Sequence, residues 1–145
     1  MTGASKRRAT AAGLLARRLA MLALFEAEFR PGAAPAALAR LADEREVPSE
    51  VRAHAADIVA GVVEHRTDLD ARIAAEAPLI PVLELGRVER TILRSAIYEV
   101  LYSAATPSGE PMRDAVSLAR IYAGDAARRL VNGVLGSVSR SGGGA

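Results

Sequence analysis

Apolar side chains recur every three or four positions along most of this chain. The clearest stretch runs from Val88 to Tyr102, and its apolar positions are Val88, Ile92, Leu93, Ile97, Val100 and Leu101. This spacing is that of an α-helix, and the stripe is wide enough to be covered from more than one side. Only a narrow polar edge remains, formed by Glu89, Arg90, Arg94 and Glu99. We therefore predict a central helix around which the other helices pack.

The same periodicity predicts three helices before this central one. They run from about Leu14 to Phe29, from Pro35 to about Glu44, and from Pro48 to Ala77 with a break near Gly61 to Thr67. Proline and glycine separate these segments, because proline cannot continue a helix and glycine favours turns. Pro78 and Pro81 end the third helix, and residues 82–85 form at most one turn.

Two further helices are predicted after the central one. A loop at residues 106–111 sets Pro111 at the start of the first, whose apolar stripe is Ala115, Leu118, Ala119 and Tyr122. Gly124 ends it, and Asp125 is a suitable N-cap for the last helix. Since no segment alternates apolar and polar residues between hairpin turns, the predicted fold is all-α, with six or seven helices.

The chain is predicted to form one domain with flexible ends. Residues 1–13 are small, polar and basic and are expected to form a flexible basic arm, and residues 140–145 a glycine-rich flexible tail. Residues 14–139 form a single all-helical domain, with halves at about 14–77 and 82–139.

Composition narrows the possible functions. Of the 145 residues half are hydrophobic, and none is cysteine or tryptophan. This excludes disulfides, thiolate metal sites and cysteine nucleophiles. No apolar run approaches the roughly 18 residues that a membrane span requires, so a soluble cytoplasmic protein is expected.

Charge is unevenly distributed along the chain. Residues 1–30 carry six basic and two acidic side chains, a net charge of +4, and residues 112–145 carry five and two, a net charge of +3. The intervening residues 31–111 carry eight basic and thirteen acidic side chains, a net charge of −5. If the two ends meet in the fold, they form a positive patch suited to a polyanion.

The basic residues are the strongest candidates for a binding site. They are Lys6, Arg7, Arg8, Arg17, Arg18, Arg128 and Arg129. Arg128 and Arg129 fall in the first turn of the last predicted helix, where positive charge opposes the helix dipole. Phosphate contact is one reason for such placement, because guanidinium groups form bidentate hydrogen bonds with phosphate. A solvated surface cluster is the alternative.

Asn132 and Gly133 interrupt an otherwise regular helical pattern. Glycine inside a helix costs about 1 kcal/mol relative to alanine. Because Val134, Leu135 and Val138 keep the helical period, we interpret Gly133 as a position of close approach by another backbone or a ligand.

Catalytic and metal sites have no support in the sequence. His54 with Asp57, and His65 with Asp68, each pair an imidazole with a carboxylate one helical turn apart. The two histidines are eleven residues apart, roughly 16 Å along a helix, and cannot share one ion. There is no G-x-S-x-G nucleophile motif and no glycine-rich phosphate loop. We expect no enzyme activity, no cofactor and no metal.

Two segments resemble a known family. Leu130–Gly136 (LVNGVLG) resembles the F-V-N-G-V-L-[DG] signature of the bacterial NusB transcription antitermination factors, and Glu89–Glu99 (ERTILRSAIYE) resembles their E-[KR]-x-[IV]-L-R-x-A-[IL]-Y-E segment. Arg17–Phe25 and Pro111–Arg120 are similar to two further helices of the family. Some residues differ: Gly13-Leu14-Leu15 replaces an arginine cluster, Arg113-Asp114 an Asn-Glu pair, and Phe25 a tyrosine.

The resemblance implies two small helical bundles packed together, without catalysis. It implies binding to the boxA element of nascent ribosomal RNA leaders, together with a small-subunit ribosomal protein, NusE, in the antitermination complex of RNA polymerase. The seven basic residues are then assigned to RNA, Glu84, Glu89 and Phe25 to the partner protein, and Asn132 and Gly133 to a structural motif. A homodimer is possible.

Two other interpretations remain open. One is a helical protein-interaction module without specific RNA binding. The other is the RNA-binding module of a ribosomal RNA cytosine methyltransferase, which would require a cofactor domain and a catalytic cysteine that this sequence lacks.

Overall fold

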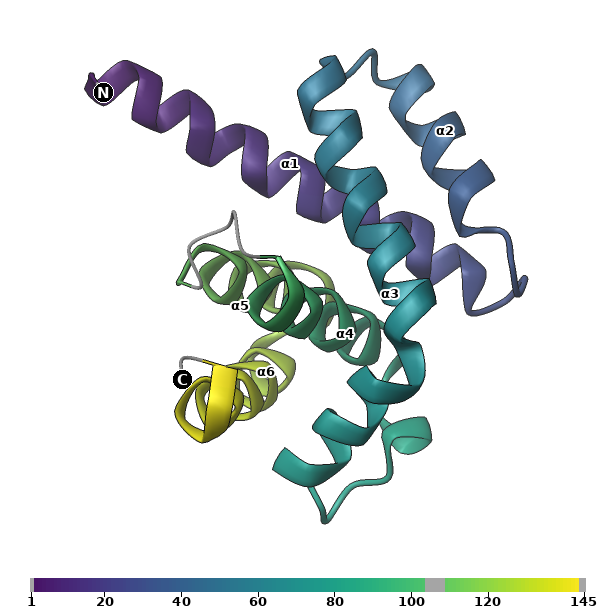
Figure 1. The fold of residues 1–145 in the computed structure, drawn as a ribbon, viewed down its shortest axis with the longest axis vertical. Coiled ribbons are helices and arrows are strands. Elements are labelled where there is room, and N and C mark those ends of the chain that lie inside the picture. Colours follow the sequence, from purple (N-terminus) through teal and green to yellow (C-terminus); the bar gives the residue numbers. More distant parts are fainter. Residues whose placement is uncertain (1, 104–108, 144–145) are drawn as a thin grey trace. The chain divides into compact units, whose positions relative to one another are not determined.

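The computed structural model describes residues 2–103 and 109–143, and in these residues it contains six α-helices, two shorter helical turns and no strand (Figure 1). The all-α class predicted from the periodicity is confirmed. The elements in chain order are α1 (Gly3–Ala27), α2 (Ala34–Glu44), α3 (Ser49–Glu76), the 3-10 turn η1 (Val82–Glu84), α4 (Arg87–Tyr102), α5 (Gly109–Ala123), α6 (Asp125–Val138) and the π-helical turn η2 (Ser139–Gly143).

The chain divides into two compact units, Met1–Ala60 and Gly61–Ala145. The division lies inside α3, earlier in the chain than the proline-rich segment that separates the two predicted halves. The later turns of α3 belong with α4, because Arg94 on α4 forms two hydrogen bonds, of 2.6 and 3.0 Å, with the carboxylate of Asp70.

In the first unit, α1 begins well before the predicted Leu14. The hydroxyl of Thr2 accepts a hydrogen bond from the backbone N–H of Ser5 and caps the helix. The turns that follow are rich in alanine, the best helix former, so residues 3–13 are helical without being buried. The prediction of a separate arm over these residues is therefore corrected to an exposed extension of α1.

The first unit is built on the packing of α1 against α2. Arg40 on α2 donates two hydrogen bonds, of 3.2 and 2.5 Å, to the carboxylate of Glu26 on α1. Both side chains are exposed, and this hydrogen bond lowers the pKa of Glu26 from its ordinary value. The buried apolar residues of this unit include Leu19, Ala20, Ala23, Leu38, Ala55 and Ile58.

In the second unit α4 is central, as predicted, and it contacts α5, α6 and η2. Its apolar stripe is buried, and Leu93 and Ile97 have no exposed surface. The predicted polar edge is largely buried as well. Arg90 donates to the backbone oxygen of Leu83 at 3.2 Å, and Arg94 is held by Asp70. Burying these arginines is tolerated because they have hydrogen-bond acceptors.

The break predicted near Gly61 to Thr67 is found at His65, whose backbone angles are non-helical. The imidazole of His65 stacks on the ring of Tyr102, with ring centroids 4.0 Å apart. One turn earlier, a Cβ atom at Gly61 would overlap the ring of Tyr98. Glycine is therefore required here for α3 and α4 to approach closely.

The end of the chain is more ordered than the predicted tail. Residues 139–143 form η2, and Ser141 donates a hydrogen bond to Glu76 and accepts one from Arg72 at 3.1 Å. The first turn of α5 includes Gly109 to Pro111, because proline is tolerated in a first turn. The rest of the predicted loop, residues 106–108, and the last two tail residues lie outside the described residues.

Candidate nucleic-acid interface

The first turns of α1 present the basic residues Lys6, Arg7 and Arg8 to solvent. Arg7 and Arg18 are eleven residues apart, close to three helical turns, so they lie on the same face of α1 at a spacing of roughly 16 Å. The helix therefore carries positive charge along more than half of its length.

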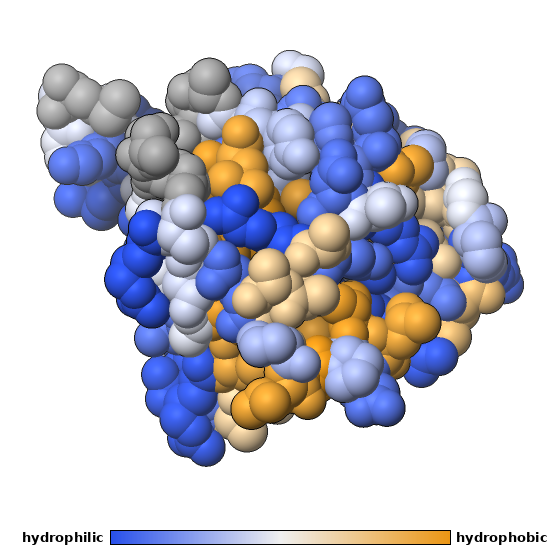
Figure 2. Space-filling model, turned by 60° about the horizontal axis from the view of Figure 1, so that its bottom comes forward, coloured by the Kyte–Doolittle hydropathy of each residue, from blue (hydrophilic) through white to orange (hydrophobic). Residues whose placement is uncertain are grey.

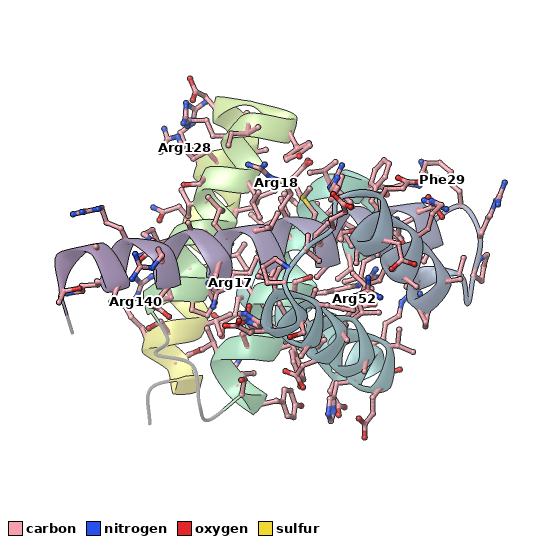
Figure 3. The ribbon with its side chains drawn as sticks, turned by 90° about the horizontal axis from the view of Figure 1, so that it is seen from above. Arg17, Arg18, Phe29, Arg52, Arg128 and Arg140 are labelled. Carbon is pink, nitrogen blue, oxygen red and sulfur yellow. The ribbon has the colours of Figure 1, made fainter. Side chains whose placement is uncertain are left out.

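The two arginines in the middle of α1 differ in their exposure. Arg17 is buried, with 7% of its surface exposed, whereas Arg18 is half-buried. They leave the helix on different sides (Figure 3). The Arg17 guanidinium lies back along its own helix, since a Cβ atom at Gly13 would be 2.9 Å from its Nη1 atom. Arg17 thus has little surface for a phosphate group, in contrast to Lys6, Arg7 and Arg8.

The other predicted basic pair lies at the start of α6, in the second unit. Arg129 is exposed and Arg128 half-buried, and Figure 3 shows Arg128 near one end of α6 and Arg140 near the other. The predicted N-cap is wrong. Gly124, with φ +93°, turns the chain directly after α5, so Asp125 becomes the first helical residue and makes no cap. Its carboxylate lies 3.6 Å from Nε of Arg128 and offsets the cost of positive charge in this turn.

The predicted close approach at Gly133 is not found among the described residues. A Cβ atom there would have no neighbour within 4 Å, and both Asn132 and Gly133 are exposed. Nothing within the described parts of the chain therefore explains the glycine, although α6 passes through it without interruption.

The predicted partner residues lie in both units. In the second unit, Glu84 is exposed in η1 and Glu89 is half-buried in the first turn of α4, where its carboxylate folds back over Gly86. In the first unit, Phe25 is half-buried and makes an edge-on contact with Phe29, with ring centroids 5.4 Å apart. Phe29 is mostly exposed near the end of α1 (Figure 3).

Several exposed apolar residues were not predicted as surface. Leu79, Ile80 and Leu83 lie between α3 and α4, and the view of Figure 2 brings this end of the structure forward, where hydrophobic side chains gather at the surface. Leu79 is 94% exposed and Leu83 is 76% exposed. In the sequence these apolar residues lie beside prolines and do not follow a helical period, which is the signal that could have identified them as exposed. Tyr122, predicted on a buried stripe, is 41% exposed in the last turn of α5.

The two histidines are not arranged as metal ligands. In the described part of the chain no group of three or more histidine, cysteine, aspartate or glutamate side chains could hold a metal ion. No helix among the described residues is long and apolar enough to cross a membrane.

The fold and the exposed charges define a class: all-helical proteins that present arginine and lysine on helix surfaces. The family model named NusB family matches residues 14–140. The chain belongs to the NusB family.

Relatives of known name support this membership over most of the chain. The transcription antitermination protein NusB of Dehalococcoides mccartyi (strain CBDB1) is 32% identical over 126 residues, covering 87% of this chain and 88% of the relative. The protein of the same name from Herpetosiphon aurantiacus is 36% identical over 125 residues, covering 84% and 86%.

Solved structures share the fold. NusB of T. maritima superposes with a TM-score of 0.83 and 25% identity, covering 89% of this chain and 91% of that one. A chain from the crystal structure of antitermination factors NusB and NusE in complex with dsRNA has a TM-score of 0.82 and 25% identity, covering 90% and 97%.

Proposed function

We propose that this chain is a transcription antitermination protein that binds the boxA element of nascent ribosomal RNA leaders together with the small-subunit ribosomal protein NusE. The observation that carries this proposal is the match of the NusB family model to residues 14–140. The crystal structure of a related chain with NusE and dsRNA supports both kinds of partner. In this role the complex joins the antitermination machinery on RNA polymerase in the cytoplasm, without catalysis or a cofactor.

The RNA-binding part of the proposal rests on exposed positive charge. Lys6, Arg7 and Arg8 on α1, and Arg129 on α6, are exposed, and Arg18 and Arg128 are partly so. Phosphate contacts by such side chains dominate the affinity of proteins for nucleic acids. Arg17, being buried, contributes mainly by supporting α1.

The partner-binding part rests on acidic and apolar side chains. Glu84 and Glu89 flank the start of α4, and Leu83 is exposed next to Glu84. Arg90 holds the backbone oxygen of Leu83, so the leucine is presented from a fixed backbone. In the first unit, Phe25 and the exposed Phe29 offer an aromatic pair. Carboxylates around apolar anchors suit a basic ribosomal protein, because interface affinity concentrates in buried apolar anchors while charges set specificity.

Binding of a single-stranded boxA RNA and a scrambled RNA tests the proposal, with affinity measured at several salt concentrations. We expect boxA to bind more tightly. Replacing Lys6, Arg7 and Arg8 together with alanine should weaken binding and reduce the slope of log affinity against log salt by about 2, since each lost contact to single-stranded RNA removes about 0.7.

The matched control is Arg45→Ala, which removes an exposed arginine at the end of α2, outside the basic segments assigned to RNA. We expect it to leave the affinity and the salt slope unchanged. Equal, weak binding of both RNAs by the wild type would contradict the proposal and favour the protein-interaction interpretation. An equal effect of Arg45→Ala and the triple variant would contradict the assignment of the basic residues.

A further inference from the structure

The segment between α3 and α4 carries exposed apolar side chains on a backbone with little regular structure. Leu79 and Leu83 are largely exposed. Pro78 and Pro81 have no N–H group to donate, and the regular structure of this segment is the single turn η1. Such a segment loses conformational entropy when a partner orders it, unless contacts within the protein order it beforehand.

Arg90 on α4 supplies contacts of this kind. Its Nη1 atom donates to the backbone oxygen of Leu83 at 3.2 Å and to that of Leu85 at 3.5 Å. The Arg90 side chain is buried, with 8% of the residue exposed, and Leu85 is buried as well. Within the turn, the N–H of Glu84 donates to the oxygen of Pro81 at 2.8 Å. The guanidinium therefore holds the backbone on both sides of Glu84.

The position of Arg90 is unfavourable for an arginine in other respects. It is the fourth residue of α4, where positive charge opposes the helix dipole. Burying a guanidinium also carries a desolvation cost. A flexible apolar side chain such as methionine could fill the same space without either cost. The hydrogen bonds to the two carbonyl groups give a reason for arginine at this position.

We propose that Arg90 is a positioning residue for the partner protein: it holds Leu83 and Glu84 in the arrangement that NusE binds, without touching NusE itself. This inference rests on the proposed function and deepens it, because that function assigns the contacts and this one assigns the residue that orders them before binding. When only a fraction of the molecules has an ordered turn, the apparent affinity falls in proportion to that fraction.

Arg94 provides a matched control on the same helix. It lies four residues after Arg90, is also buried, and donates to the carboxylate of Asp70 at 2.6 and 3.0 Å. Because both arginines are buried and hydrogen-bonded, replacing either one should lower the free energy of unfolding. Asp70 belongs to α3, whereas Arg90 donates to the segment that bears Leu83. A purely structural role would give both replacements the same effect on partner binding.

The first experiment measures the affinity for purified NusE of Arg90→Met, Arg90→Lys and Arg94→Met. We expect a loss of about 3- to 20-fold for Arg90→Met, because methionine fills the space but has no donor for the carbonyl groups. Arg90→Lys keeps a donor and should recover most of the affinity. Arg94→Met should change the affinity less than about twofold, although it lowers the stability of the fold.

A double-mutant cycle tests whether Arg90 acts through Leu83. Leu83→Ala removes the apolar side chain but keeps the backbone oxygen to which Arg90 donates. We expect Leu83→Ala to weaken NusE binding by about fivefold or more in the wild type, and by a clearly smaller factor in Arg90→Met, since a misplaced leucine contributes less. Equal factors in the two backgrounds would show that the residues act independently and would overturn the positioning role.

Amide hydrogen exchange measures the order of the turn in the free protein. The N–H groups of Glu84 and Leu85 are hydrogen-bonded within the turn. Both should exchange more slowly in the wild type than in an unstructured peptide, faster in Arg90→Met, and at the wild-type rate in Arg94→Met. Exchange at the unstructured rate in the wild type would overturn the proposal without the use of any variant.

The outcomes separate this inference from the proposed function. Wild-type affinity of Arg90→Met, an equal loss in Arg90→Met and Arg94→Met, or unchanged exchange at Glu84 in Arg90→Met would overturn the positioning role while leaving partner binding intact. Failure of the wild-type protein to bind NusE would overturn both.

Discussion

Two glycines within helices have opposite surroundings. Gly61 in α3 faces the ring of Tyr98 so closely that no side chain fits, while Gly133 in α6 faces open space. The first glycine is explained by the packing of α3 against α4. The second has no neighbour within 4 Å among the described residues, and glycine inside a helix costs about 1 kcal/mol relative to alanine.

Gly61→Ala should therefore lower the free energy of unfolding by about 1–3 kcal/mol, the usual cost of overpacking a core. Gly133→Ala should raise it by up to about 1 kcal/mol, because alanine is the better helix former. Urea unfolding of both variants measures the two changes. If the free energy of unfolding changed in the same direction in both variants, the surroundings described for these two glycines would be wrong.

The exposed pair of Glu26 and Arg40 gives a prediction about pH. The hydrogen bond from Arg40 lowers the pKa of Glu26 from its ordinary value. A carboxyl group whose pKa is lower in the folded state stabilises the fold above its unfolded pKa, and this contribution is lost as pH falls through the folded pKa. Arg40→Gln should raise the pKa of Glu26, as followed by an NMR titration of the carboxyl group. An unchanged titration curve would show that the pair does not form in solution.

At the scale of elements, α4 organises the second unit through both apolar and polar contacts. Its apolar stripe is buried, and Arg94 ties it to α3 through Asp70. Arg90 fixes the chain before it through the backbone oxygen of Leu83. A helix with this role determines where the exposed residues between α3 and α4 are presented.

The Arg94–Asp70 pair can be tested against a neighbouring carboxylate. Asp70→Asn should lower the free energy of unfolding by about 1–3 kcal/mol, because it weakens a charge-assisted hydrogen bond to a buried guanidinium. Asp68→Asn, two residues away and exposed, should change it by less than about 0.5 kcal/mol. Chemical denaturation of both variants provides the comparison, and equal stabilities would contradict the importance of the pair.

Most elements could be predicted from the sequence, because apolar residues at helical spacing and proline or glycine at the ends mark a helix without ambiguity. The position of α4 and the break in α3 follow from such local signals. The early start of α1 could not be predicted, since its first turns bury nothing and depend on alanine and a threonine cap. The exposure of Tyr122 depends on which turns of α5 other elements cover, which periodicity does not specify.

The candidate site was predictable only in part. Basic side chains were identified from their charge, but the burial of Arg17 and the exposure of Lys6, Arg7 and Arg8 depend on the face of α1 that is covered. Consecutive residues in a helix point in directions about 100° apart, so Arg17 and Arg18 have different surroundings. When charged residues are adjacent in the sequence, the number of them therefore overstates how many side chains a ligand can reach.

At the scale of the whole molecule, the charge distribution suits two different partners. Both ends of the sequence are basic, with net charges of +4 and +3, and the middle is acidic, with a net charge of −5. The ends supply the residues proposed to contact RNA, and the middle supplies Glu84 and Glu89. If RNA and a basic protein bind to this protein cooperatively, each partner should increase the affinity for the other by the same factor.

The most direct test of this account is the affinity for boxA RNA measured with and without purified NusE, alongside a scrambled RNA. We predict that NusE increases boxA affinity by about fivefold or more, that boxA increases the affinity for NusE equally, and that scrambled RNA shows a smaller gain. Equal and weak binding of both RNAs that does not respond to NusE would contradict the assignment of this chain as an antitermination factor.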